Sequence, residues 1–262
     1  MNVLFLGYGK MGRALGDTWL KHHLVTKLVA VDPHLESDSN YFFNKQAEVP
    51  TQSFDLVILA VKPNLAKTVL QDINPAFLNN ACIISVMAGV EISSINEMIN
   101  NKPIPIVRVM PNTPVLVQAG CCAIYTSSDL NNDLKQNIDQ LFSSVGYSVW
   151  LDNEDDLYAV TAVSGSGPAY FHLFTEAIAE VGVKLGLSVE IANALAKQTA
   201  YGASLLQNQS HADLVELRKN VTSPNGTTHA AIQVFEENSE LRKLTDKALK
   251  AANDRSIELS KA

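Results

Sequence analysis

The sequence predicts an α/β protein in which a doubly wound, mostly parallel sheet is followed by an all-helical half. In the first half, short apolar runs alternate with amphipathic segments, which is typical of βαβ units around a parallel sheet. A glycine-rich turn follows the first apolar run. After about Asp152 the strand signals stop, and the rest of the chain has the pattern of successive helices. We therefore expect one domain over residues 1–152 and a helical domain over residues 153–262.

Seven apolar runs are expected to form strands, at residues 2–6, 28–32, 55–61, 81–87, 104–110, 122–126 and 148–151. Between the first two runs, Met11, Leu15 and Trp19 recur at four-residue spacing, so they place an apolar stripe on one face of a helix. A similar pattern over 129–145 predicts the last helix of the sheet domain. In the helical half, clusters of Gly, Ser and Pro predict breaks at 164–168, 186–188 and 221–226.

Composition excludes several classes of protein. Of 262 residues, 47% are hydrophobic and 18% charged, as in a globular chain with a sizeable core. The net charge of −7 disfavours nucleic acid as a partner, and no apolar stretch approaches the roughly 18 residues of a membrane span. The three cysteines lack the spacing of a metal site or a disulfide framework. From that spacing we expect no metal. The N-terminus has no basic leader segment, so we expect a cytoplasmic protein.

The first motif is a G-x-G-x-x-G turn between a predicted strand and a predicted helix. Gly7 permits the tight turn, Gly9 lets the backbone approach a pyrophosphate, and Gly12 lets helix and strand pack closely. This context predicts a Rossmann-type dinucleotide site. Its first residues are Gly7, Tyr8, Gly9, Lys10, Met11 and Gly12.

An acidic residue follows at the end of the next predicted strand. Asp32 lies twenty residues after Gly12, where a carboxylate can accept hydrogen bonds from ribose hydroxyls and repel a 2′-phosphate. No arginine follows in residues 33–36. We therefore predict NAD(P)H as cofactor, with NADH weakly favoured. In the alternative interpretation, Pro33 redirects the loop so that Asp32 faces solvent and His34 meets the phosphate.

Other strand ends should contribute to the same site, because ligand contacts in a doubly wound sheet come from the carboxyl ends of the strands. Three such ends carry the segments 60–63, 87–89 and 108–114, and two further motifs lie at 163–170 and 221–228 in the helical half. The additional cofactor-binding candidates are Ala60, Val61, Lys62, Pro63, Ala88, Met110, Pro111 and Asn112.

With these motifs in this order and at about this spacing, the sequence resembles the pyrroline-5-carboxylate reductase family over essentially the whole chain. The resemblance implies NAD(P)H-dependent reduction of the cyclic imine 1-pyrroline-5-carboxylate to L-proline, the last step of proline biosynthesis. It also implies a homodimer formed through the helical domain and a loop at 221–228 that binds the substrate carboxylate. The sequence leaves open whether such dimers form a higher oligomer of dimers. The implied substrate-binding residues are Val221, Ser223, Asn225, Gly226, Thr227 and Thr228.

A cyclic imine with a carboxylate needs a hydride on carbon, a proton on nitrogen and an anion site. Ser223 and the backbone N–H groups of residues 225–227 can form a carboxylate nest at a helix start. Thr228 would present its hydroxyl to the ring nitrogen and is the catalytic candidate. Asp32 and Asn225 depart from the family pattern. Asn225 stands where the family usually has a glycine, and because Asn tolerates left-handed backbone geometry we expect the loop to keep its shape.

Two other functions remain as alternatives. A β-hydroxyacid dehydrogenase or another imine reductase shares a glycine turn and a helical half, but such hydroxyacid enzymes need a catalytic lysine, and none lies within 164–170 or 222–228. A non-catalytic dinucleotide-binding redox sensor would have no use for a carboxylate nest. The row Ala192, Ala196 and Ala200 indicates either a buried helix within the domain or a seam between subunits. On the second interpretation the active site is shared between two chains.

Overall fold

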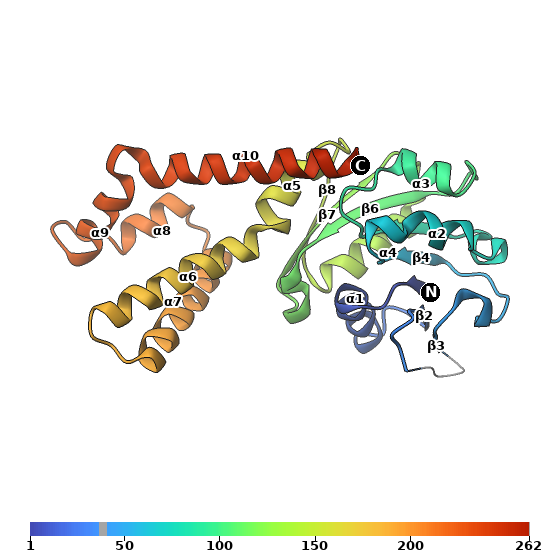
Figure 1. Ribbon diagram of the computed structural model, residues 1–262, viewed down its shortest axis with the longest axis horizontal. Coiled ribbons are helices and arrows are strands. Elements are labelled where there is room, and N and C mark those ends of the chain that lie inside the picture. The colour runs from blue at the N-terminus through green and yellow to red at the C-terminus, as the bar shows by residue number, and fades with distance from the viewer. Residues whose placement is uncertain (37–40, 262) are drawn as a thin grey trace. The chain divides into compact units, whose positions relative to one another are not determined.

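The structure, a computed structural model, describes residues 1–36 and 41–261. Its described residues form one eight-stranded sheet with the strand order β3-β2-β1-β4-β5-β6-β7-β8 (Figure 1). The first six strands are parallel, β7 runs antiparallel to β6, and β8 is parallel to β7. The bounds are β1 Asn2–Leu6, β2 Lys27–Val31, β3 Phe42–Phe43, β4 Leu56–Leu59, β5 Cys82–Ser85, β6 Ile106–Pro111, β7 Gly120–Thr126 and β8 Gly146–Trp150.

The helices divide between the sheet region and the second half of the chain. Those of the sheet region are α1 Lys10–Lys21, α2 Ala66–Gln71, α3 Ile92–Met98 and α4 Asn132–Ser143. Those that follow are α5 Asp156–Val160, α6 Gly167–Lys184, α7 Val189–Gln209, α8 Leu214–Asn220, α9 Thr227–Glu236 and α10 Glu240–Ser260. A π-helical turn occupies Thr161–Gly165, and short 3₁₀ turns occupy Gln46–Glu48, Pro63–Leu65, Pro75–Leu78, Thr113–Val117 and Glu237–Ser239.

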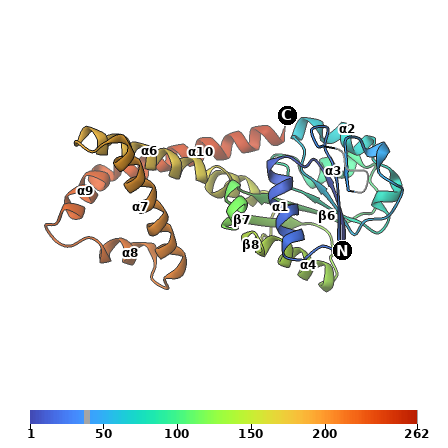
Figure 2. The ribbon, with the colours of Figure 1, turned by 90° about the horizontal axis from the view of Figure 1, so that it is seen from below.

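The sheet is doubly wound, as predicted. Helices α1 and α4 pack on one face, and α2 and α3 pack on the other (Figures 1 and 2). Trp19 of α1 is fully buried, and its indole Nε1 donates to the carbonyl oxygen of Leu141 in α4 at 2.9 Å. Because the chain fills one side of β1 with β2 and β3 before crossing to β4, the switch point lies between β1 and β4. Ligands bind at such a switch point, beside the carboxyl ends of the strands.

All seven predicted strands are present, with ends displaced by a few residues. The run 55–61 shrinks to Leu56–Leu59, because Ala60 already belongs to the turn that closes against Gly7. β3 was missed because two residues, Phe42 and Phe43, are too few to show an alternating pattern. The predicted helix 129–145 is α4.

The change from strands to helices lies between Trp150 and Asp156, where the sequence predicted it. The compact units of the chain divide elsewhere: one comprises residues 1–166 with 252–262, and the other comprises 167–251. α5 and the π-helical turn therefore pack with the sheet. The division into domains at 152/153 stays a prediction.

The predicted break at 164–168 takes an unexpected form. Instead of a loop, the backbone widens into the π-helical turn and continues directly as α6. A Cβ on Gly165 would lie 2.7 Å from Cε of Met110, so a glycine lets this turn approach the end of β6. The breaks at 186–188 and 221–226 are confirmed, whereas those around 210–213 and 237–239 were not foreseen.

The alanine row packs within the chain. Ala192 and Ala196 of α7 are buried, and a Cβ on Gly182 of α6 would lie 3.3 Å from Cβ of Ala192. The close approach that Ala192 permits is therefore made by α6 of the same chain. An intersubunit role stays a prediction only for the half-buried Ala200.

A buried ion pair joins the sheet to the segment after β8. Arg108 of β6 is 4% exposed, and its Nη1 lies 2.7 Å from Oε1 of Glu154. The same carboxylate oxygen accepts the backbone N–H of Ile92, the first residue of α3, at 2.8 Å. Glu154 therefore satisfies a buried cation and a helix start at once.

We expect Glu154→Ala to lower the free energy of unfolding by about 3 kcal/mol, because removing one partner leaves the Arg108 charge buried and unpaired. Urea denaturation of the two proteins measures the difference. Glu258→Ala is the matched control: it breaks the exposed Arg255–Glu258 pair in the same compact unit and should change the stability by less than about 0.5 kcal/mol. Equal effects of the two substitutions would contradict the role given to Glu154.

Candidate active site

The glycine turn has the geometry of a dinucleotide site. Gly7 has φ +92°, and a Cβ there would lie 2.6 Å from the carbonyl oxygen of Ala60. A Cβ on Gly12 would lie 2.7 Å from the carbonyl oxygen of Gly7. The chain's own packing therefore requires glycine at both positions. Gly9 differs, because a Cβ there meets nothing within 4 Å, which leaves the space open to a ligand.

The start of α1 lies directly after Gly9. Gly9 is the N-cap residue, no side chain caps the helix, and its first turn carries no acidic residue. Backbone N–H groups at such a helix start attract an anion. Lys10 is exposed at this position and Met11 is half-buried, so both predicted residues lie beside the turn.

Tyr8 serves the core rather than the surface of the turn. Its side chain is 2% exposed, its hydroxyl donates to Oδ1 of Asp17 at 2.7 Å, and its ring meets Phe5 edge-on. Burial, followed by the hydrogen bond to Asp17, raises the pKa of Tyr8. A Cβ on Gly16 would lie 2.5 Å from the Tyr8 hydroxyl. Sequence reasoning missed Gly16 and Asp17, since nothing in their spacing marks them as partners of Tyr8.

Asp32 is turned toward the glycine turn. Its Oδ2 accepts the backbone N–H of Tyr8 at 2.9 Å, and its Oδ1 accepts the backbone N–H of His34 at 3.0 Å. The carboxylate therefore lies where a ribose is expected, and it also fixes the turn. Each carboxylate oxygen has a second lone pair, which leaves acceptor capacity for a ribose hydroxyl.

The remaining cofactor candidates follow the carboxyl ends of β4, β5 and β6. Ala60, Val61, Lys62 and Pro63 lie after β4, Ala88 lies exposed after β5, and Met110, Pro111 and Asn112 lie at or after the end of β6. Because these strands are parallel to β1, the candidates share one edge of the sheet with the glycine turn.

Asn112 has a structural task of its own. Its side chain is buried: Nδ2 donates to the carbonyl oxygen of Ser164 at 2.9 Å, and Oδ1 accepts the backbone N–H of Cys121 at 2.8 Å. The amide thus ties the end of β6 to the π-helical turn. Turns of this kind are frequent at functional sites, and this one overlaps the start of the 163–170 motif.

The loop 221–228 comprises the connection between α8 and α9, residues 221–226, and the first two residues of α9. Asn225 has φ +61°, the left-handed conformation expected of Asn in place of glycine, and the backbone N–H of Gly226 donates to the carbonyl oxygen of Ser223 at 3.0 Å. No side chain caps α9, which begins at Thr227. Ser223, Thr227 and Thr228 are exposed, so their hydroxyls and the N–H groups of the helix start face outward. Val221 is exposed at the beginning of the loop.

The predicted residues thus form two groups. The cofactor candidates lie in the compact unit that contains the sheet, and the loop 221–228 lies in the unit 167–251. The first group has an open glycine and an uncapped helix start, and the second has a left-handed turn and an uncapped helix start. The binding roles of both groups stay predictions.

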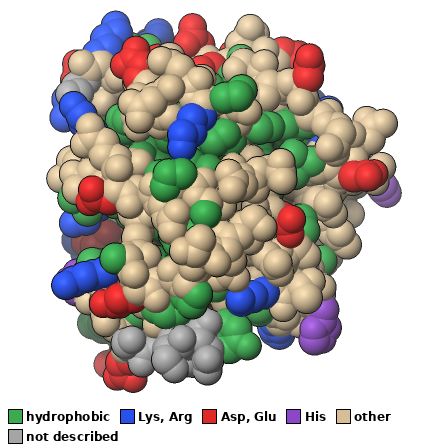
Figure 3. Space-filling model, turned by 90° about the vertical axis from the view of Figure 1, so that its right-hand side faces the viewer, with side chains coloured by type: hydrophobic (Ala, Val, Ile, Leu, Met, Phe, Trp, Pro, Cys, Tyr) green, Lys and Arg blue, Asp and Glu red, His purple; other side chains and the backbone are tan. Residues whose placement is uncertain are grey.

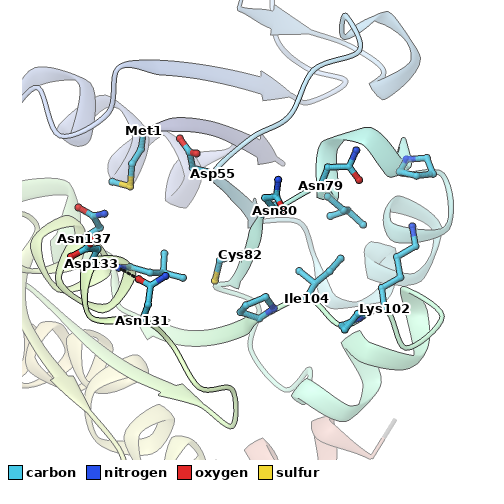
Figure 4. A pocket seen from close by; sticks show the side chains of 16 residues that line it. Met1, Asp55, Asn79, Asn80, Cys82, Lys102, Ile104, Asn131, Asp133 and Asn137 are labelled. Carbon is cyan, nitrogen blue, oxygen red and sulfur yellow. Dashed lines mark hydrogen bonds between the residues drawn. The ribbon is translucent and has the colours of Figure 1, made fainter.

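A large hollow lies elsewhere among the described residues. It measures about 1000 Å³ and surrounds the amino ends of the strands, at the edge of the sheet opposite the glycine turn (Figure 4). Asp55, Lys102 and Asp133 line it, together with Cys82, whose pKa is raised to about 12 by burial. None of the predicted site residues lines this hollow.

Two observations on the described residues concern helix hydrophobicity and the grouping of possible metal ligands. None of their helices combines the length and the apolar character needed to span a bilayer, and they contain no group of three His, Cys, Asp or Glu side chains placed to hold a metal ion. On the face that Figure 3 shows, basic and acidic side chains are interspersed over the described residues.

Comparison with known proteins adds independent findings. The family model described as pyrroline-5-carboxylate reductase dimerisation matches residues 154–259, and that described as NADP oxidoreductase coenzyme F420-dependent matches residues 2–89. The pyrroline-5-carboxylate reductase of Pseudomonas aeruginosa is 39% identical over 98% of this chain and 96% of the relative. That of Corynebacterium melassecola is 40% identical over 99% of this chain and 98% of the relative.

Solved structures agree. A pyrroline-5-carboxylate reductase from Coxiella burnetii superposes with a TM-score of 0.90 at 33% identity, covering 100% of this chain and 99% of the other. The Plasmodium falciparum enzyme with NADP bound superposes with a TM-score of 0.86 at 31% identity, covering 99% of this chain and 98% of the other. With such relatives over nearly its full length, the chain belongs to the pyrroline-5-carboxylate reductase family.

Proposed function

We propose that this chain is an NAD(P)H-dependent oxidoreductase that reduces 1-pyrroline-5-carboxylate to L-proline, the last step of proline biosynthesis. Membership of the family along nearly the whole chain is the observation that carries this proposal. The open space at Gly9 and the left-handed Asn225 support it, because they give this chain a dinucleotide turn and a substrate loop.

On the cofactor side, the residues of the chain bind the dinucleotide and orient it. The N–H groups at the start of α1 hold the pyrophosphate close to Gly9, and the Asp32 carboxylate accepts hydrogen bonds from the ribose hydroxyls. The dinucleotide supplies the hydride when bound. The protein contributes position, since a nicotinamide held against the imine carbon makes the transfer effectively unimolecular.

On the substrate side, the loop 221–228 supplies an anion site and a hydroxyl. The Ser223 hydroxyl and the backbone N–H groups of Asn225 and Thr227 donate hydrogen bonds to the carboxylate at the positive end of α9, while the Gly226 N–H closes the turn onto Ser223. Thr228 hydrogen-bonds the ring nitrogen. An imine that binds already protonated needs no strong general acid, which agrees with a loop of hydroxyl groups without a carboxylate.

A spectrophotometric assay tests the proposal. Purified protein is mixed with pyrroline-5-carboxylate and either NADH or NADPH, and the loss of reduced-nicotinamide absorbance is followed. Oxidation that depends on the imine is expected. Oxidation with neither cofactor would contradict the proposal, and tight cofactor binding without turnover would favour a dinucleotide sensor instead.

A homodimer through the helical half accompanies this function. Residues 154–259 match the family's dimerisation model. α6 and α7 carry large apolar side chains that a single chain leaves exposed, namely Phe171, Leu173, Phe174, Leu195, Tyr201 and Leu206. A second chain would cover such surfaces. An oligomer of dimers and a cytoplasmic location are also proposed; the three free thiols of the chain fit a reducing compartment.

Asp32→Ser should shift the cofactor preference toward NADPH. The change removes a negative charge beside the expected 2′-phosphate and one acceptor of ribose hydroxyls, so kcat/KM should rise for NADPH and fall for NADH. We expect the ratio to change by about tenfold, or roughly 1.4 kcal/mol. Asp55→Ser is the control, because Asp55 also accepts a backbone N–H, that of Asn2 at 2.6 Å, but lies at the other edge of the sheet. A wild-type enzyme that already prefers NADPH would refute this interpretation of Asp32.

A further inference from the structure

One carboxylate links three helices beside the substrate loop. The carboxylate of Glu236, the last residue of α9, accepts a hydrogen bond from Nη1 of Arg218 in α8 at 2.6 Å. It also accepts hydrogen bonds from two atoms of Arg242 in α10, from Nε at 2.9 Å and from Nη2 at 2.7 Å. These three residues, the Glu236 bridge, all lie in the compact unit 167–251.

Arg218 connects this bridge to the loop. Its carbonyl oxygen accepts the hydroxyl of Thr222 at 2.6 Å, which fixes the entry to the loop, while its guanidinium reaches Glu236. The loop's other end is the first turn of α9, the helix that Glu236 closes. The bridge therefore fixes both helices that border residues 221–226.

The geometry of the bridge is restrictive. Arg242 contacts both carboxylate oxygens of Glu236, and such a fork holds a carboxylate in one orientation. Hydrogen bonds from Arg242, then Arg218, lower the pKa of Glu236. A hollow of about 330 Å³ lies among Arg218, Lys219, Thr222, Ile232, Glu236 and Arg242. This hollow is open to solvent, and the ionic contacts border it where the ends of α8 and α9 meet the start of α10.

We propose that the Glu236 bridge is a positioning device for the substrate loop: by holding α8 against α9 it sets the shape of the carboxylate nest, and hence the affinity for the imine. This inference rests on the proposed function. Glu236, Arg218 and Arg242 are positioning residues, since each acts through the loop.

A purely electrostatic effect predicts the opposite sign. The cluster carries three cations, Arg218, Lys219 and Arg242, against one carboxylate. If it only attracted the anionic substrate, Glu236→Gln would make the region more positive and lower the KM for the imine. If it positions the loop, the same change loosens the nest and raises that KM. Arg242→Lys separates the two further, because it keeps the charge but loses the fork.

Steady-state kinetics of the full-length enzyme decide between them. For Glu236→Gln and Arg242→Lys we expect the KM for pyrroline-5-carboxylate to rise roughly threefold to tenfold, with kcat and the KM for NAD(P)H within about twofold of wild type. Lys250→Gln is the matched control: it breaks the exposed Asp246–Lys250 pair in the same compact unit and should leave all three constants unchanged.

An unchanged or lowered imine KM in Glu236→Gln would overturn the proposal, as would a lowered melting temperature with unchanged KM. Because the bridge is partly exposed, with side-chain exposures of 37%, 32% and 63% for Arg218, Glu236 and Arg242, we expect both variants to fold. Failure of the proposed function is a separate result: the wild-type enzyme would then not oxidise NAD(P)H with the imine.

Discussion

Gly9→Trp is expected to weaken NAD(P)H binding by about 100-fold while the protein still folds. Gly9 has φ −72°, which any residue adopts, and nothing lies within 4 Å of a Cβ there. The protein itself therefore tolerates a side chain. A dinucleotide does not, because the indole would occupy the space in which the pyrophosphate approaches the start of α1. Binding is measured by fluorescence titration, and folding by circular dichroism and thermal denaturation.

Two other glycines serve as controls for this variant. Gly7→Ala should destabilise the fold, since its φ is +92° and its Cβ would overlap the carbonyl of Ala60. Gly202→Ala, in the open middle of α7, should leave cofactor binding unchanged and raise the free energy of unfolding by about 0.5 to 1 kcal/mol, because alanine favours a helix interior. Wild-type affinity in Gly9→Trp would show that the dinucleotide does not bind at this turn.

The elements that could be predicted from sequence are those with local signals. The strands β1, β2 and β4 to β8 each contain a run of apolar residues. The turn after β1 has three glycines, and each has a different steric reason to be glycine. Asn225 was predicted correctly for the same reason, because a left-handed turn depends on one residue's own backbone. Periodicity and turn chemistry contain this information without knowledge of the fold.

Contacts between distant residues left no such signal. Arg108 and Glu154 are 46 residues apart, and nothing in their spacing marks them as the partners that the structure joins in a buried ion pair. Asn112 was assigned to the cofactor from its place at a strand end, yet its amide joins Ser164 and Cys121. Charged and amide side chains have several possible partners, and only the fold selects one.

Thr228→Ala is expected to lower kcat/KM for the imine by roughly 10-fold to 150-fold, with reduced-cofactor affinity nearly unchanged. Thr228 is exposed in the first turn of α9, in a different compact unit from the glycine turn. Its hydroxyl is proposed to bond the charged ring, and one such hydrogen bond contributes roughly 1.5 to 3 kcal/mol. Thr227→Ala, next to it in the same turn, is the control and should have a smaller effect. Unchanged turnover in Thr228→Ala would remove the catalytic role.

The same two lesions test whether the active site is shared between subunits. If the glycine turn of one chain serves the loop 221–228 of its partner, unfolding and refolding Gly9→Trp together with Thr228→Ala creates heterodimers. In each of them one of the two sites carries neither lesion. Random association makes about half the dimers mixed, so about a quarter of wild-type activity should return. Mixing each variant with itself is the control. If each site is built from a single chain, every site keeps a lesion and the mixture stays at the average of its parents.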